Sequence, residues 1–194
     1  MTRIYKYGFW LFLICTLTII NLYRLTKNGC EQENSLCKDI NEKRISSLML
    51  TNTIMARKIN PILGENLITN KKEEIFNENT LVILLSDFTC NACQADELKR
   101  IELLKDSFKS KNISIIAVTT KDKIGQVITQ RKIAKIDYPM YWVDNAVFKN
   151  NISFANIYPQ IMLIKNNQIV SSFIPVPKDE KFSENYFEFL LKTI

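Results

Sequence analysis

The 194-residue sequence contains no histidine. Without an imidazole, the commonest general base is missing, and so are Cys-His and Ser-His nucleophile pairs and zinc sites with histidine ligands. Four glycines are also too few for a glycine-rich loop that cradles phosphates. Any chemistry must therefore come from cysteine, acidic residues, lysine, tyrosine or a bound cofactor.

Basic residues do not cluster, although the formal net charge is +6. No run of five basic residues occurs, and Lys71-Lys72 and Lys99-Arg100 each lie beside acidic residues. This pattern is typical of a solvated surface and argues against a nucleic-acid partner. With 46% hydrophobic residues, the chain can fill the core of one ordinary domain and carry an appendage.

The longest apolar run, YGFWLFLICTLTIINLY at residues 7–23, predicts a transmembrane helix. A helix of this length spans roughly 26 Å, close to the thickness of the hydrocarbon core. Arg3 and Lys6 precede the run and no small-x-small cleavage pattern follows it, so we expect an uncleaved signal anchor over residues 1–24. The positive-inside rule favours a cytoplasmic N-terminus. The expected location is the inner (cell) membrane, single-pass, with the C-terminal domain in the periplasm or outside the cell.

Residues 25–78 are expected to form a linker and a helical extension. After a polar stretch, apolar residues recur at helical spacing between Lys38 and Lys58, namely Ile40, Ile45, Leu48, Leu50, Ile54 and Met55. This spacing predicts an amphipathic helix. Asn60-Pro61 ends it, because the residue before a proline is pushed out of the helical region. Residues 62–79 are mixed and are expected to form short strands that lead into the main domain.

Residues 79–194 show the alternation of an α/β domain. Short apolar runs predict strands at 81–86, 113–120, 139–144, 160–165 and 169–174, and the first two are apolar enough to be buried on both faces. Helical spacing predicts helices at 91–110, from Asp122 to about Ile136, and at 181–193, with Asp122 as a cap. Lys165-Asn166-Asn167-Gln168 is a turn. The order strand, helix, strand, helix, strand, hairpin and helix predicts one sheet flanked by helices.

Cys90 and Cys93 stand between the strand at 81–86 and the helix that follows it, in the segment SDFTCNACQADEL. A cysteine at a helix N-terminus meets unpaired N–H groups and the positive end of the helix dipole, which favour the thiolate. A thiolate at Cys90 can attack a disulfide, and Cys93, one turn later, can resolve the mixed disulfide. This arrangement indicates thiol–disulfide chemistry.

At these residues the chain resembles the thioredoxin superfamily, particularly its membrane-anchored TlpA/ResA-like thiol–disulfide oxidoreductases. The resemblance covers about residues 79–194 and includes Ile157-Tyr158-Pro159-Gln160-Ile161-Met162-Leu163, where the family carries a cis-proline. It implies that Pro159 is that cis-proline and that Tyr158 and Pro159 bind an extended substrate segment. It also implies disulfide-containing protein substrates, such as apocytochrome c or another oxidised secreted protein. A membrane protein would supply electrons, and no metal or organic cofactor is required.

The surroundings of the motif depart from the family. Thr89 replaces the usual tryptophan, and Asn91-Ala92 replaces the common Gly-Pro or Pro-Pro. No histidine lies between the cysteines, which indicates a reducing or isomerase-like protein and not a disulfide-forming oxidant. The buried acid of thioredoxin corresponds to Leu84. The candidate proton acceptors for Cys93 are therefore Asp87, Asp96 and Glu97, although acids near a helix start are ordinarily only favourable to its dipole.

Two other interpretations of the cysteines stay open. Cys30 and Cys37 could join Cys90 and Cys93 in a zinc site of four thiolates, but the spacing is irregular for that purpose. We expect instead a structural disulfide between Cys30 and Cys37, which requires the intervening chain to turn. These two cysteines could also exchange electrons with Cys90 or remain free. The Cys90–Cys93 pair could also be a static disulfide in a non-catalytic thioredoxin-fold binding or assembly module.

Overall fold

The computed structural model describes residues 36–76, 79–87 and 91–194. The chain divides into two compact units, Met1–Lys43 and Arg44–Ile194. The predicted membrane span at residues 7–23 lies outside the described residues. Of the helices within the described ranges, none combines the length and apolar character needed to cross a bilayer. In the first unit, residues 36–43 are helical.

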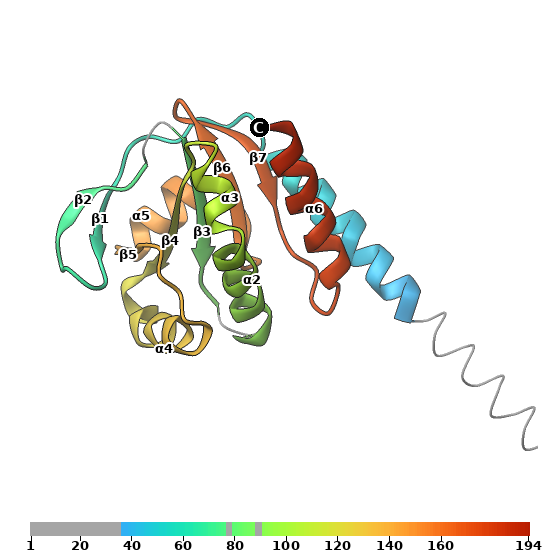
Figure 1. Cartoon of the computed structure of the whole chain (residues 1–194), viewed down its shortest axis with the longest axis horizontal. Helices are drawn as coiled ribbons and strands as arrows, with labels where there is room; N and C mark the ends of the chain where they lie inside the picture. The colour runs from blue at the N-terminus through green and yellow to red at the C-terminus, as the bar shows by residue number, and fades with distance from the viewer. Residues whose placement is uncertain (1–35, 77–78, 88–90) are drawn as a thin grey trace, which may run out of the picture. The chain divides into compact units, whose positions relative to one another are not determined.

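The second unit is built on a seven-stranded sheet with the order β2-β1-β5-β4-β3-β6-β7 (Figure 1). The strands are β1 (Leu63–Asn66), β2 (Lys72–Glu74), β3 (Asn79–Leu85), β4 (Ser114–Thr120), β5 (Met140–Val143), β6 (Gln160–Lys165) and β7 (Gln168–Phe173). β3 and β4, and β4 and β5, pair in parallel, whereas the other neighbours are antiparallel. The five strands predicted after residue 79 are confirmed, with ends shifted by at most two residues.

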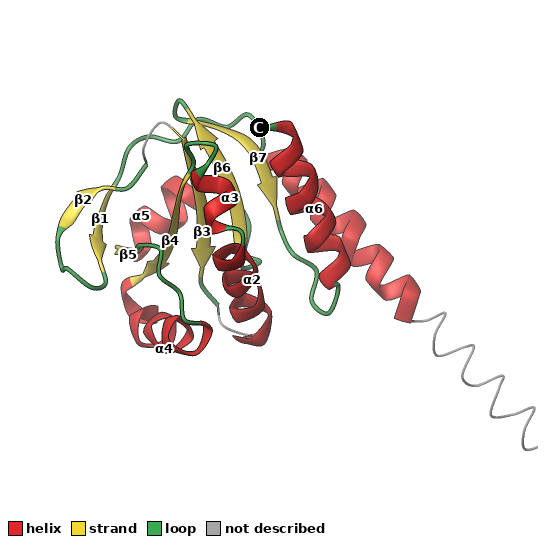
Figure 2. Ribbon diagram, viewed as in Figure 1, coloured by secondary structure: helices red, strands yellow, loops and turns green. Residues whose placement is uncertain are grey.

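Helices cover both faces of this sheet (Figure 2). The longer ones are α2 (Asn91–Leu103), α4 (Ile124–Ala134) and α6 (Glu180–Thr193), and the short ones are α3 (Lys105–Lys109), α5 (Asn145–Val147), a 3₁₀ turn (Lys121–Lys123) and a π turn (Phe148–Ile152). Apolar residues of α2, α3, α4 and α6 form one core cluster with the sheet. A second cluster on the opposite face contains Ile54, Ile59 and Ile62 with Phe148 and Ile152.

β3 shows why the sheet needs cover on both faces. Leu81, Ile83 and Leu85 belong to the first cluster, whereas Val82 and Leu84 belong to the second, and all five are fully buried. Because successive side chains of a strand point to opposite faces, an unbroken apolar run is stable only when both faces are covered. The prediction of doubly buried strands is thus confirmed.

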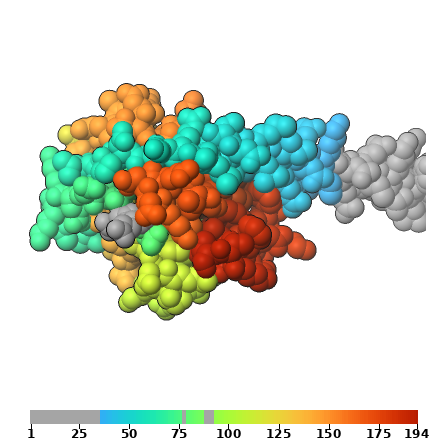
Figure 3. Space-filling model, turned by 90° about the horizontal axis from the view of Figure 1, so that it is seen from above, coloured from blue at the N-terminus to red at the C-terminus, as the bar shows by residue number. Residues whose placement is uncertain are grey.

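The predicted amphipathic helix is shorter at its C-terminal end than expected. Residues 36–54 are helical, and Ala56 then adopts a left-handed backbone with φ 65°. The chain continues along the β6–β7 hairpin: Ala56 N donates to Ile169 O at 2.9 Å, and Ile169 N donates to Arg57 O at 3.0 Å. The helix therefore ends at Ile54, six residues before Asn60, because backbone pairing with β7 takes over. Figure 3 shows this cyan segment beside the orange residues of the hairpin.

The short strands expected within residues 62–79 are confirmed as β1 and β2, and they join the main sheet because β1 pairs with β5 through Glu65 and Asn66. Two other expectations need correction. The expected helix at 91–110 is broken at Leu104, whose φ of −94° and ψ of 1° leave the helical region. Asp122 does not cap α4, because it lies in a 3₁₀ turn and the cap position is Lys123, which makes no side-chain capping bond.

Candidate functional site

Cys93 lies in the first turn of α2 and is partly buried. It is disulfide-bonded. Cys90 lies in the connection from β3 to α2, outside the described residues, so its pairing with Cys93 stays a prediction. The described geometry places Cys93 where the sequence predicted it, directly after a buried strand and at the head of a helix.

A pocket of about 580 Å³ opens beside Cys93. One wall is α2, which contributes Cys93, Asp96, Glu97 and Arg100. The other wall is the segment 175–181, which comprises most of the connection from β7 to α6 and the first two residues of α6. Residues three and four positions apart share a helix face, so Cys93, Asp96 and Glu97 face the same pocket. The pocket therefore brings two of the three predicted proton acceptors next to a cysteine.

Glu97 is the buried one of these acids, with 5% of its surface exposed. Its Oε1 accepts a hydrogen bond of 2.6 Å from Ser183 Oγ on α6, and its Oε2 lies 3.5 Å from Nε of Arg100. Burial raises the pKa of Glu97 above its ordinary value, and this effect outweighs the lowering by Ser183 and Arg100. A carboxyl group with a raised pKa is better matched to a thiol as a proton acceptor.

The other two acids occupy different positions. Asp96 lines the pocket but is exposed to solvent. Asp87 is exposed, has a left-handed backbone with φ 40°, and lies near Tyr158, whose pKa its negative charge helps to raise. The structure thus separates the three candidates, and only Glu97 combines burial with a place in the pocket at Cys93.

Pro159 and Tyr158 lie at the same end of the sheet as the start of the β3–α2 connection. The Tyr158–Pro159 peptide bond is cis, the isomer that the resemblance implied. In the pairing of β3 with β6, Gln160 lies opposite Leu84, near the C-terminal end of β3. Pro159 is buried, whereas Tyr158 is partly exposed. The ring of Tyr158 packs 5.9 Å from that of Phe148.

Gln160 is a residue of this region that the sequence analysis did not single out. It is fully buried, its Oε1 accepts from Phe154 N at 3.3 Å, and its Nε2 donates to Ala155 O. These two bonds fix the loop that precedes Pro159. The sequence did contain a signal, because Gln160 is a single polar residue at the start of the apolar run QIMLI. A polar residue buried there is expected to have hydrogen-bond partners, as buried polar groups usually do. Ser183 carried no comparable signal.

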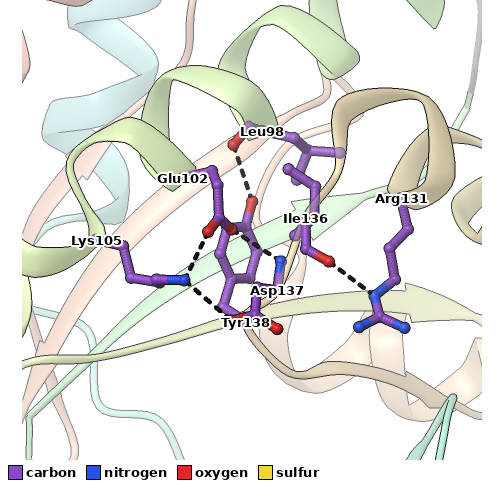
Figure 4. A network of polar contacts seen from close by, with 7 residues as sticks. All are labelled: Leu98, Glu102, Lys105, Arg131, Ile136, Asp137 and Tyr138. Atoms are coloured by element: carbon purple, nitrogen blue, oxygen red, sulfur yellow. Dashed lines mark hydrogen bonds and ion pairs between the residues drawn. The ribbon is translucent and has the colours of Figure 1, made fainter.

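The far end of α2 is fixed by a polar network (Figure 4). Tyr138 donates a hydrogen bond of 3.2 Å to the carbonyl of Leu98, and Asp137 N donates to Glu102 Oε2 at 2.9 Å. Lys105 Nζ lies 2.7 Å from Glu102 Oε1 and 3.1 Å from Asp137 Oδ2. The network ties α2 to the loop before β5, which keeps the helix that carries Cys93 and Glu97 in place.

The prediction of a structural disulfide between Cys30 and Cys37 is wrong at Cys37. This cysteine is a free, exposed thiol. It lies within the helical residues 36–43, whereas residues 31–35, where the expected disulfide loop would turn, lie outside the described residues. Cys30 lies outside the described residues. Within the described ranges, no three histidine, cysteine or acidic residues come together as metal ligands would.

Comparison with known proteins finds similarity in structure but not in sequence. No protein-family model matches the chain, and no curated protein matches it. The thioredoxin domain of a thiol-disulfide oxidoreductase from Bacteroides vulgatus aligns with a TM-score of 0.52 at 15% identity, over 68% of this chain and 96% of the other.

Two further solved structures align in the same way. A thiol:disulfide interchange protein from a Bacteroides species has a TM-score of 0.53 at 15% identity, over 69% of this chain and 88% of its own. Peroxidoxin BcpB from Mycobacterium tuberculosis has a TM-score of 0.54 at 8% identity, over 72% of this chain and 97% of its own. At such identities the similarity concerns the fold. The chain has an α/β thioredoxin-like fold, with a central sheet flanked by helices.

Proposed function

We propose that this protein is a membrane-anchored thiol–disulfide oxidoreductase that reduces disulfides of extracytoplasmic proteins. The observation that carries the proposal is the placement of Cys93 in the first turn of α2, disulfide-bonded and beside the pocket that holds the buried Glu97. Cys90, three residues before Cys93 in the sequence, is the partner that the proposal requires. The thioredoxin-like fold supports the same chemistry.

The reaction transfers two electrons from the cysteine pair to the substrate. The Cys90 thiolate attacks one sulfur of the substrate disulfide, that bond breaks, and a mixed disulfide forms while the departing substrate thiolate takes a proton from water. Cys93 then gives its proton to the carboxylate of Glu97 and attacks the Cys90 sulfur. The mixed disulfide breaks, the second substrate sulfur leaves as a thiolate that takes a proton from water, and Cys90 and Cys93 are joined as a disulfide. A dithiol protein of the membrane would reduce that disulfide again.

Substrate binding is assigned to the partly exposed Tyr158 and to the backbone at Pro159. The position of Pro159 beside the end of β3 supports this assignment. An extended segment of a substrate can pair with exposed backbone as an added strand. The proposal also includes membrane attachment through residues 7–23 and a location of residues 44–194 outside the cytoplasm. Both rest on the apolar run alone.

Insulin reduction in the presence of dithiothreitol tests the proposal. We expect the wild-type protein to accelerate insulin precipitation and Cys90→Ser to abolish the acceleration, because no attacking thiolate is left. Cys93→Ser should also lose turnover and accumulate a mixed disulfide with the substrate. Cys37→Ser is the matched control, because this free thiol lies in the other unit and should be dispensable. Wild-type protein that does not exceed the dithiothreitol background would refute the proposal.

One observation favours a second candidate, a thioredoxin-fold binding module with a static disulfide. Leu84, at the position of the family's buried acid, is fully buried in the second core cluster. A site without an acid there lacks one route for proton transfer. The buried Glu97 offers another route, which is why we place catalysis first. A static disulfide would show a reduction potential below about −300 mV, as structural disulfides do.

A further inference from the structure

The segment that faces Cys93 across the pocket has little support of its own. Residues Pro175, Val176, Pro177, Lys178 and Asp179 line the pocket between β7 and α6. The two prolines have no N–H to donate, and Lys178 has a left-handed backbone with φ 65°. Within the segment, Asp179 N donates to Val176 O at 3.1 Å. The position of the segment therefore depends largely on contacts with residues outside it.

Arg44 supplies such a contact. Its guanidinium meets the carboxylate of Asp179 as a two-pronged fork, with Nε 2.5 Å from Oδ2 and Nη2 2.9 Å from Oδ1. Only 6% of the Asp179 side chain is exposed, compared with 38% for Arg44. A planar guanidinium that pairs with both carboxylate oxygens fixes direction as well as distance. Arg44 thereby holds the end of the pocket wall in one orientation.

Asp179 joins this wall to α6. Its Oδ1 accepts from Phe182 N at 3.3 Å, as an N-cap does, and the guanidinium of Arg44 lies 5.7 Å from the centre of the Phe182 ring. α6 also carries Ser183, which bonds Glu97. A shift of Asp179 would therefore move both the wall and the partner of the buried carboxyl.

The helical residues 44–54 are themselves anchored at both ends of β7. Ser47 is buried and its Oγ donates to Ile174 O, just after the end of the strand. At the other end, Ile59 N donates to Asn167 O at 2.9 Å in the turn before β7. Residues 44–59 thus run along the edge strand β7 and are bonded near both of its ends. Arg44, at the start of this stretch, contacts the pocket wall at Asp179.

We propose that Arg44 is a positioning residue for the cysteine site, which holds the 175–179 wall against Cys93 and Glu97 through its paired contact with Asp179. Arg44 does not line the pocket itself, so it acts through Asp179. The wall limits access to Cys93 and keeps water from Glu97. As a statement about catalysis the inference rests on the proposed function, whereas its structural part can be measured without turnover.

The test is the alkylation rate of Cys93 by iodoacetamide in the full chain carrying Cys90→Ser, assigned by peptide mass spectrometry. The exposed Cys37 in the same chain is the internal reference. Adding Arg44→Gln or Asp179→Asn should raise the rate at Cys93 at least threefold and leave Cys37 unchanged. Arg44→Lys keeps the positive charge but not the paired contact with both carboxylate oxygens, so it should raise the alkylation rate at Cys93 by less. This conservative variant keeps the test informative if Arg44→Gln fails to fold.

The matched control is Arg131→Gln, which removes an arginine of α4 that does not line the pocket and whose Nε donates to Ile136 O at 3.1 Å. It should leave the rate at Cys93 unchanged. Because Arg44 and Asp179 act through one contact, the double variant Arg44→Gln/Asp179→Asn should match the single variants. In the background with both cysteines, Arg44→Gln should lower kcat for insulin reduction with KM unchanged.

An unchanged rate at Cys93 in both single variants, with native circular dichroism, would overturn the inference. So would an additive effect in the double variant, since two independent contacts would then be at work. Failure of the proposed function gives a different result: the wild-type protein would not reduce insulin, while the alkylation of Cys93 would still respond to Arg44→Gln.

Discussion

Ser183 on α6 donates a hydrogen bond of 2.6 Å to Glu97 on α2, and both residues are buried. The bond joins two helices that pack on the same face of the sheet. It satisfies one carboxylate oxygen, while Arg100 lies 3.5 Å from the other. Even with these partners, burial raises the pKa of Glu97, so the ionised carboxylate is less stable here than in water.

We predict that Glu97→Gln slows disulfide exchange and makes the fold less sensitive to pH. The exchange rate should fall roughly tenfold or more, in the range by which general acid–base groups contribute. A carboxyl whose folded pKa is raised favours folding below its unfolded pKa, and this contribution is lost as pH rises through the folded pKa. The ordinary value is 4.5, so the wild-type free energy of unfolding should fall as pH rises above 4.5.

Urea unfolding of wild type and Glu97→Gln between pH 4.5 and 8 measures this difference, and the difference isolates Glu97 from the other acids. Asp122, Asp179 and Glu188 have lowered pKa values and act with the opposite sign at more acidic pH. Asp96→Asn is the comparison for activity, since Asp96 lines the same pocket but is exposed. A loss of rate in Asp96→Asn but not in Glu97→Gln would reassign the proton acceptor.

Tyr158 should contribute to substrate binding more than to chemistry. Its ring packs on Phe148, and its hydroxyl lies 2.5 Å from Ser153 Oγ. We expect Tyr158→Ala to raise KM for a protein substrate about five- to tenfold, because truncating an aromatic contact commonly costs more than about 1 kcal/mol. Tyr158→Phe keeps the ring and should stay within about twofold of wild type in KM. Steady-state kinetics that show a fall in kcat alone would contradict this role.

The helical residues before the sheet should be part of the stable domain. Ile54 is fully buried in the second core cluster, whereas Ile45, on the same helix, is 53% exposed. We therefore predict that Ile54→Ala lowers the free energy of unfolding by about 2–4 kcal/mol, whereas Ile45→Ala changes it by less than ~0.5 kcal/mol. Equal effects of the two variants in urea unfolding would mean that these residues do not pack on the sheet.

Apolar patterning was sufficient to predict the central strands. The run LVILLS and the run ISIIAVTT contain enough consecutive apolar residues to require burial on both faces, and β3 and β4 have it. The turn at Asn166-Asn167 was predictable for a local reason, since asparagine tolerates the positive φ values of 49° and 60° found there. These features depend on a few neighbouring residues.

The boundaries that escaped prediction depend on distant parts of the chain. Short strands were expected within residues 62–79, but β2 consists of Lys72–Glu74 with every side chain exposed, so its own residues do not show where the strand lies. The end of the first helix is set by pairing with β7, more than 100 residues later. The same holds for the site: sequence spacing nominated three acids, but the burial that singles out Glu97 comes from Ser183 and the 175–181 segment.

The reduction potential of the Cys90–Cys93 couple tests the central claim most directly. The protein would be equilibrated with defined ratios of reduced and oxidised glutathione, and the fraction of reduced cysteine pair followed by mass spectrometry, with Cys37→Ser to remove the free thiol. A reducing exchange enzyme predicts a reversible two-electron titration between about −270 and −180 mV, the range from thioredoxin to protein disulfide isomerase. A potential below about −300 mV would identify a static disulfide and contradict the proposed function.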